Sequence, residues 1–154
     1  MTSELKVDII KNADGSNRTS FQARGYAGGV NLASTHTGLT AWYFDTVDHN
    51  VGSAFSNSSS TGGVFTVAVA GTYLIQGGYG YKNSTDHLGL MLWKNTTNVY
   101  RSWTVNTSPQ HHNSQFSHIW QCSVGDEFRI GNHSSYSVPH TDTYYAYFNA
   151  HLLV

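Results

Sequence analysis

The chain has 154 residues and a formal net charge of −1, so its length suits a single domain with one core. Charged residues make up only 11% of the chain and aromatic residues 14%, which argues against intrinsic disorder and against long helices. The lysines and arginines are scattered and form no basic stripe, which excludes an electrostatic nucleic-acid surface.

Residues 1–24 are expected to be an attachment or edge-strand segment, and residues 25–154 the folded domain. In "ELKVDIIKN" the apolar residues Leu5, Val7 and Ile9 alternate and lead into the turn sequence "ADGS". The segment has no long apolar run, so we expect neither a signal peptide nor a membrane-spanning helix.

Short runs with apolar residues at alternate positions follow along the rest of the chain, separated by Gly, Asn, Asp and Ser clusters. No window shows the 3.6-residue period of an amphipathic helix. The predicted strands are "LTAWYFDTV", "GVFTVAV", "TYLIQGGYGY", "HLGLMLWKN", "NVYRSWTVN", "QFSHIWQCSV", "DEFRIGN" and "TYYAYFNAHLLV". Eight to ten strands at this spacing predict an antiparallel sandwich or barrel.

The C-terminal strand has two unlike faces. One face carries an ordinary core set, Tyr144, Ala146, Phe148, Ala150 and Leu152. The other face has no formal charge and carries Tyr145, Tyr147, Asn149, His151 and Leu153. Either this second face is a half-exposed aromatic surface, or it is buried against another subunit. Tyrosine suits such a contact because its ring buries a large apolar area while its hydroxyl keeps a hydrogen-bond partner.

Five motifs in a fixed order carry a resemblance to a known fold. They are "NVGSAF", "GGVFTVAVAGTYLI", "WKN", "CSVGDEFRI" and "YFNAHLLV". This order resembles the globular jelly roll of the first complement component and its tumour-necrosis-factor-like relatives, over about residues 40–154. Two positions depart from the family's pattern, since Ala68 stands where it usually has Pro and Asn149 where it usually has Gly.

The resemblance implies an all-β jelly-roll sandwich in which the two strands around "VAG" belong to different sheets. It implies that Tyr73 and Ile75 point into the sandwich. It also implies a homotrimer whose final strand lines the threefold axis. The trimer-interface candidates carried over in this way are Gln76, Tyr145, Tyr147, Asn149 and His151.

His151 is the metal candidate of the sequence, because a threefold axis would place three copies of it close together. Three imidazoles could hold a metal or an anion, or repel one another once protonated at acid pH. A hydrogen bond from His151 to Tyr147 or to water is the alternative. We expect no cofactor.

The N-terminal "ELKVDIIKNADGSN" resembles the start of many tail and head fibre proteins of bacterial viruses. Cys122 is the single cysteine, which excludes an intramolecular disulfide and suits a chain folded in a reducing cytosol. Together with the absent signal peptide and the jelly roll, these features favour a virion component made in the host cytoplasm. Residues 1–24 would then contact other virion proteins.

Aromatic, amide and imidazole side chains gather near the predicted strand ends. Sugar rings stack on aromatic faces, while Asn and His can bond to sugar hydroxyls, so this mixture could hold a glycan or another receptor of a host surface. The ligand-binding candidates are Tyr79, Tyr81, Trp103, His111, His112, Tyr136 and His140. Core packing is the alternative for these aromatic residues.

The sequence contains no nucleophile elbow, no H-E-x-x-H zinc motif and no phosphate loop, so we do not expect an enzyme. The expected function is that of a trimeric fibre or knob of a bacteriophage, which presents loops to the host surface. Two alternatives stay open: a structural decoration or vertex protein of a capsid, and a freestanding lectin-like binding module.

Overall fold

The computed structural model describes residues 19–25, 28–32, 34–82, 87–105, 111–133 and 146–153, and it describes the backbone alone at 81, 82, 87, 88, 103–105, 111 and 112. These residues form twelve strands. Within these ranges there is no helix of the length and hydropathy that a membrane crossing requires. The strand expected at residues 4–12 lies outside the described residues.

One sheet has five strands in the order β10-β7-β12-β1-β4. Its strands are β1 (Ser20–Arg24), β4 (Thr46–Val51), β7 (Gly71–Lys82), β10 (His111–Cys122) and β12 (Tyr147–Leu152). All neighbours in it are antiparallel. The final strand β12 therefore lies in the middle of the sheet, where both of its edges are paired.

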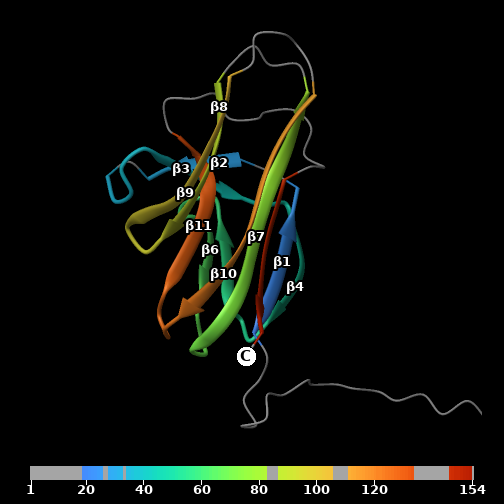
Figure 1. Cartoon of the computed structure of the whole chain (residues 1–154). Coiled ribbons are helices and arrows are strands. Elements are labelled where there is room, and N and C mark those ends of the chain that lie inside the picture. The colour runs from blue at the N-terminus through green and yellow to red at the C-terminus, as the bar shows by residue number, and fades with distance from the viewer. Residues whose placement is uncertain are drawn as a thin grey trace, which may run out of the picture.

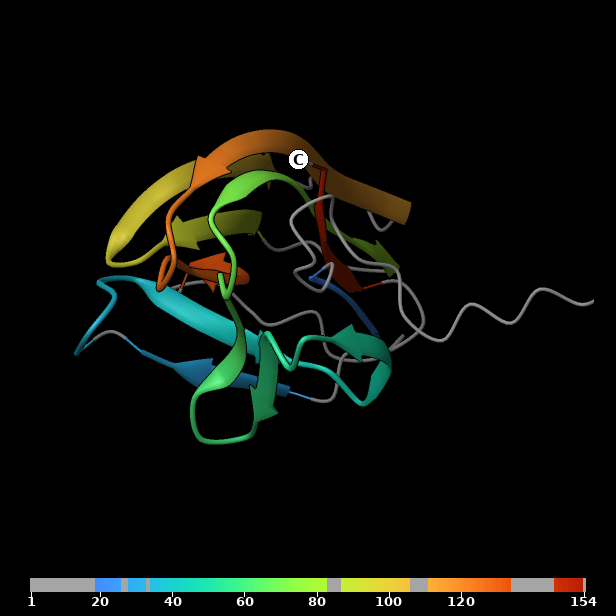
Figure 2. The same cartoon turned by 90° about the horizontal axis from the view of Figure 1, so that it is seen from below.

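The other sheet has seven strands, with the order β2-β3-β11-β6-β5 and with β8 joined to β11 and β9 joined to β8. Its strands are β2 (Gly28–Asn31), β3 (Leu39–Tyr43), β5 (Phe55–Ser58), β6 (Gly62–Thr66), β8 (His87–Lys94), β9 (Thr97–Val105) and β11 (Glu127–His133). The two sheets lie face to face as a sandwich, with β7 and β10 running diagonally across one layer (Figures 1 and 2).

The step from β6 to β7 carries the chain from one sheet to the other, as the sequence predicted. The side chains of Tyr73 and Ile75 on β7 are fully buried, which confirms that they point into the sandwich. The Tyr73 hydroxyl donates a hydrogen bond to the carbonyl of Val69 at 2.7 Å, within the connection between the two strands. This bond ties the corner to the core beneath it.

Aromatic rings from both sheets fill the space between the layers. Phe21 on β1 stacks against Phe55 on β5 with ring centroids 4.2 Å apart, and it also contacts Phe65 and Phe148. Phe21 is fully buried. Because its neighbours come from β5, β6 and β12, this one ring joins the five-stranded sheet to the other layer.

The outer face of the seven-stranded sheet carries its own small apolar cluster of Leu39, Ala41, Met91 and Trp93. His36 lies edge-on to Trp93 with ring centroids 5.6 Å apart. Beside it, Arg129 forms an ion pair with Glu127 at 2.8 Å. This face is therefore covered in part by the protein's own loop and bears paired charges.

The folded domain includes the end of the segment that the sequence analysis assigned to attachment. β1 lies between β12 and β4 and pairs with both, so residues 20–24 belong to the sandwich although the expected boundary was at residue 25. β1 is an inner strand of the sheet and not an edge strand. Residues 1–18 lie outside the described residues.

Replacing Phe21 with Ala should lower the free energy of unfolding by about 3–5 kcal/mol, because the change opens a cavity between the two layers. Urea denaturation followed by tryptophan fluorescence measures this loss. The matched control is Val124→Ala in the exposed turn after β10, which should leave the unfolding midpoint in place. Equal midpoints for the two variants would contradict the role given to Phe21.

Cys122 should be unreactive in the folded protein. Its side chain is buried, and burial raises the pKa of the thiol to about 11. Because the thiolate is the reactive form, a disulfide reagent at pH 8 should label the native chain far more slowly than the chain in guanidinium chloride. Absorbance of the released thiol product measures both rates. Immediate labelling of the native protein would show that Cys122 is accessible.

Candidate functional site: the outer face of the five-stranded sheet

Alternate side chains of the five-stranded sheet point away from the core and form one continuous surface, which we call the outer face. On β12 the core set is Ala146, Phe148, Ala150 and Leu152, all buried. The residues between them must therefore point outward. The outer face comprises Gln115, Ser117, Ile119 and Gln121 of β10; Thr72, Leu74 and Gln76 of β7; Tyr147, Asn149 and His151 of β12 with Leu153 after it; Ser20, Gln22 and Arg24 of β1; and His49 and Val51 of β4.

The strand register orders this face into rows. At one end, Ile119, Leu74, His151, Ser20 and Val51 lie side by side across the five strands. Ile119 is 68% exposed, Val51 44% and the adjoining Leu153 46%. Three large apolar side chains are thus in contact with water in this part of the outer face.

The next row is made of hydroxyl, amide and imidazole groups. It runs Ser117, Gln76, Asn149, Gln22 and His49. Gln76 Nε2 donates to Ser117 Oγ at 3.2 Å, and on the other side of the Ile119–Leu74 row Thr72 Oγ1 donates to Gln121 Oε1 at 2.9 Å. The Asn149 Oδ1 atom is buried and accepts no hydrogen bond from the residues that the structure describes. A buried acceptor without a donor is costly, so these residues leave the amide row incompletely satisfied.

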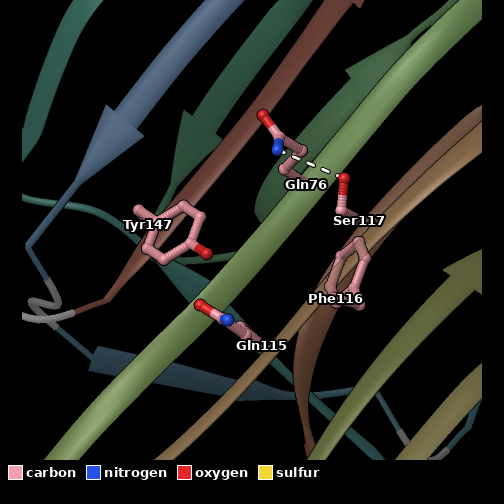
Figure 3. A pocket seen from close by; sticks show the side chains of 5 residues that line it. All are labelled: Gln76, Gln115, Phe116, Ser117 and Tyr147. Carbon is pink, nitrogen blue, oxygen red and sulfur yellow. Dashed lines mark hydrogen bonds between the residues drawn. The ribbon is translucent and has the colours of Figure 1, made fainter.

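A groove overlaps the β10 and β7 end of the amide row and lies between the side chains of β12 and those of β10. It is lined by Gln76, Gln115, Phe116, Ser117 and Tyr147 and has a volume of about 260 Å³. Figure 3 shows Tyr147 on one side of β7 and Gln115 and Ser117 on the other. A smaller hollow of about 150 Å³, which also includes Tyr147 and Gln115, continues along β7 past Gly80.

Gly78 lies between the two walls of the groove, because it is the register partner of both Gln115 and Tyr147. A Cβ atom at this position would lie 2.9 Å from both the Gln115 Cβ and the Tyr147 Cε1 atoms, and 2.8 Å from the carbonyl oxygen of Ser114. Any side chain here would push these walls apart. The groove therefore depends on the glycine run of β7, which the sequence shows as "GGYGY".

Among the outer-face side chains that the structure describes, formal charge lies only at one edge of the sheet. Arg24 Nε and Asp48 Oδ1 lie 3.0 Å apart at the β1–β4 edge, where each neutralises the other. Among the outer-face residues of β10, β7 and β12 named above, none is Asp, Glu, Lys or Arg. Burial also raises the pKa of the Tyr147 phenol, which keeps it uncharged.

Two histidines meet on this face. The rings of His49 and His151 lie 6.0 Å apart between centroids, with an angle of 36° between their planes. Burial, and then the nearby charge of His49, lower the pKa of His151. His151 is therefore neutral at pH 7, and it is only half-buried.

Four of the five trimer-interface candidates come together here. Gln76, Tyr147, Asn149 and His151 all belong to the outer face, and Asn149 is the register partner of Gln76. Tyr145 lies outside the described residues. Among the residues that the structure describes, there is no group of three or more His, Cys, Asp or Glu side chains that could hold a metal ion.

The ligand-binding candidates are more dispersed. Tyr79 is 4% exposed and its ring lies edge-on to Trp42 in the core, although it also lines the smaller hollow. Its hydroxyl is buried and has no hydrogen-bond partner among the described residues, and burial raises the pKa of the phenol. The backbone of Tyr81 pairs with that of His112.

The other candidates are placed by backbone alone or not at all. His111 begins β10 and pairs with Lys82 at the end of β7, and Trp103 pairs with Gly89 of β8. Tyr136 and His140 lie outside the described residues.

The sequence reasoning missed the contribution of β10 to the outer face. Gln115, Ser117 and Ile119 were not among the candidates, yet two of them line the groove and the third is the most exposed apolar residue of the face. A signal existed in "QFSHIWQC", where Phe116, His118 and Trp120 mark the inner face and leave the alternate residues outside.

Comparison with known proteins supports the fold. No protein-family model matches the chain, and no curated protein matches it. A solved structure that matches is the globular domain of zebrafish complement 1qA protein, with a TM-score of 0.63 and 16% sequence identity, over 88% of this chain and 98% of that chain. At this identity the likeness shows the fold alone. The chain is an all-β, complement-like jelly-roll sandwich of two antiparallel sheets.

Proposed function

We propose that the chain is a non-enzymatic homotrimeric binding module whose subunits meet through the outer face of the five-stranded sheet. In the wider setting, we propose that it is a fibre or knob protein of a bacterial virus, attached through its N-terminal segment. The first part is supported by the outer face and by the complement-like fold. The viral setting is supported by the N-terminal resemblance alone.

The observation that carries the proposal is the lack of formal charge on the outer-face side chains that the structure describes on β10, β7 and β12. A sheet face that meets water normally alternates core residues with charged or strongly polar ones. Here the three strands β10, β7 and β12 present amides, hydroxyls, a tyrosine, a histidine and exposed aliphatic groups. Depletion of charge, with tyrosine and aliphatic residues at the centre, is the composition of protein–protein interface cores.

The unsatisfied acceptor of Asn149 fits the same interpretation. A donor from a sister copy, or a water trapped at the contact, would complete the amide row. The complement-like fold favours a ring of three over other arrangements, because the resemblance places the final strand on a threefold axis. β12 lies in the middle of the sheet, as that arrangement needs.

A trimer would bind a surface more tightly than a single chain whose individual contacts are weak. The ends of β7 and β10 pair with each other, and they bring Tyr81, His111 and His112 to one end of the sandwich. Three copies held together would bind a host glycan or receptor more tightly than one copy, through effective concentration.

Replacing Ile119 with Lys should break the trimer, because it places a charge on a face that is desolvated on assembly. Sedimentation equilibrium should give the wild-type protein three times the 17.0 kDa mass of one chain. The variant should have the mass of one chain. The matched control is Val124→Lys, since Val124 is 67% exposed against 68% for Ile119 and lies in a turn off the outer face. This control should stay trimeric.

Two outcomes would refute the assembly. One is a wild-type protein that sediments as a single chain at micromolar concentration. The other is an Ile119→Lys variant as trimeric as Val124→Lys.

Recognition and scaffolding can be told apart with the trimer in hand. Binding of the purified trimer to an array of bacterial surface glycans, or to host cells, supports the receptor role. A trimer that binds neither, yet is found in purified particles by mass spectrometry, points to a decoration protein. Absence from particles would overturn the viral setting and leave the binding module.

A further inference from the structure

The two imidazoles of the outer face come from strands that are not neighbours. His49 is on β4 and His151 on β12, and β1 runs between these strands. Their rings nevertheless lie only 6.0 Å apart between centroids. The β1 residues beneath them, Ser20 and Gln22, pair with His151 and His49 respectively. Because serine is small, the imidazoles can lean over β1 toward each other.

No carboxylate compensates this pair among the described residues. From β12 the neighbours of His151 are Asn149 and Leu153, and from β7 its register partner is Leu74. From β1 the pair meets Ser20 and Gln22, and from β4 it meets Val51 beside His49. All of these side chains are uncharged, and β10 adds the uncharged Ile119 next to Leu74.

The remaining ionisable groups on this side are already engaged or neutral. Asp48 of β4 is the carboxylate nearest in sequence, but both of its oxygens accept from Arg24 Nε at 3.0 Å. Tyr147 of β12 has a pKa raised by burial, so it carries no charge at neutral or acid pH. A proton added to either imidazole therefore gains no ion-pair partner in this part of the chain.

We propose that the His49–His151 pair makes assembly through the outer face dependent on pH, so that the trimer holds at neutral pH and comes apart in mild acid. This inference rests on the proposed function, because it concerns the same contact. It adds a regulatory property: the contact senses acidification through one pair of side chains in each copy.

The direction of the pH effect follows from which state binds protons more tightly, the trimer or the separated subunits. Burial and the charge of His49 already lower the pKa of His151 in one subunit, below the ordinary value of about 6.5. Closing the outer face removes more water from the His151 imidazole and lowers its proton affinity further. Separated subunits then bind more protons than the trimer, so acid favours separation. The trimer is unaffected well above pH 6.5 and weakens as the pH falls below it.

The experiment compares sedimentation of the full chain at pH 7.5 and pH 5.0, at one ionic strength. The wild-type trimer should shift toward single chains at pH 5.0, with a dissociation constant raised about tenfold or more, since each unit of pKa shift is tenfold in affinity. The double variant His49→Gln, His151→Gln should stay trimeric at both pH values. His118→Gln is the matched control, since His118 lies on β10 among Tyr100, Phe116 and Trp120 and off the outer face. This control should dissociate at pH 5.0 like the wild type.

Circular dichroism at both pH values separates dissociation from unfolding. This matters because His36, in the loop between β2 and β3, has a pKa lowered by burial and by Arg129, so its protonation would destabilise each subunit itself. Loss of the sheet signal together with the trimer would assign the acid effect to the fold and overturn the inference.

The remaining outcomes distinguish the two proposals. A trimer that persists unchanged at pH 5.0 overturns the inference and leaves the trimer standing. Dissociation of the double variant in acid also overturns it, because another group must then titrate. A single chain at pH 7.5 removes the trimer, and the inference with it.

Discussion

The pleat of two strands, β7 and β12, is the constraint on which the rest of the structure depends. Each strand sends alternate residues to opposite sides, so Ile75 and Phe148 are buried while Gln76 and Asn149 point the other way. The core and the outer face are therefore built from the same few residues. A shift of register by one position would exchange the two sets, which the buried aromatic rings do not permit.

The outer face combines three environments. The row of Ile119 and Leu74, here called the apolar row, lies next to the amide row, and the groove shares Gln76 and Ser117 with the amide row. Only the apolar row gains much free energy when another subunit covers it, because burying aliphatic surface away from water is favourable. The amide row gives direction to the contact, because its hydrogen bonds need matching partners. The same face thus holds both the affinity and the specificity of self-association.

Most of the strands could be predicted from the alternation of apolar and polar residues. The order of the strands within the sheets could not. Period two identified β3, β6, β7, β8, β9, β10, β11 and β12 and showed which side of β12 is buried. It missed β1, β2, β4 and β5, because short strands with polar and glycine residues carry too little apolar signal. The meeting of His49 with His151 depends on the β12-β1-β4 order, and no local pattern encodes which strands become neighbours. The burial of Tyr79 was missed for a related reason, since a tyrosine near a strand end fits either the surface or the core.

The place of β1 has a consequence for how the chain is made. Ser20 pairs with His151, so β1, the first described strand, pairs with β12, the last one. Until β12 has been made and is free to pair, Phe21 has no Phe148 to pack against and the edge of β1 toward β12 stays open. Contacts this distant in sequence form late and slowly. The sandwich therefore closes only once β12 is available, and a chain that lacks this strand exposes an unpaired strand edge.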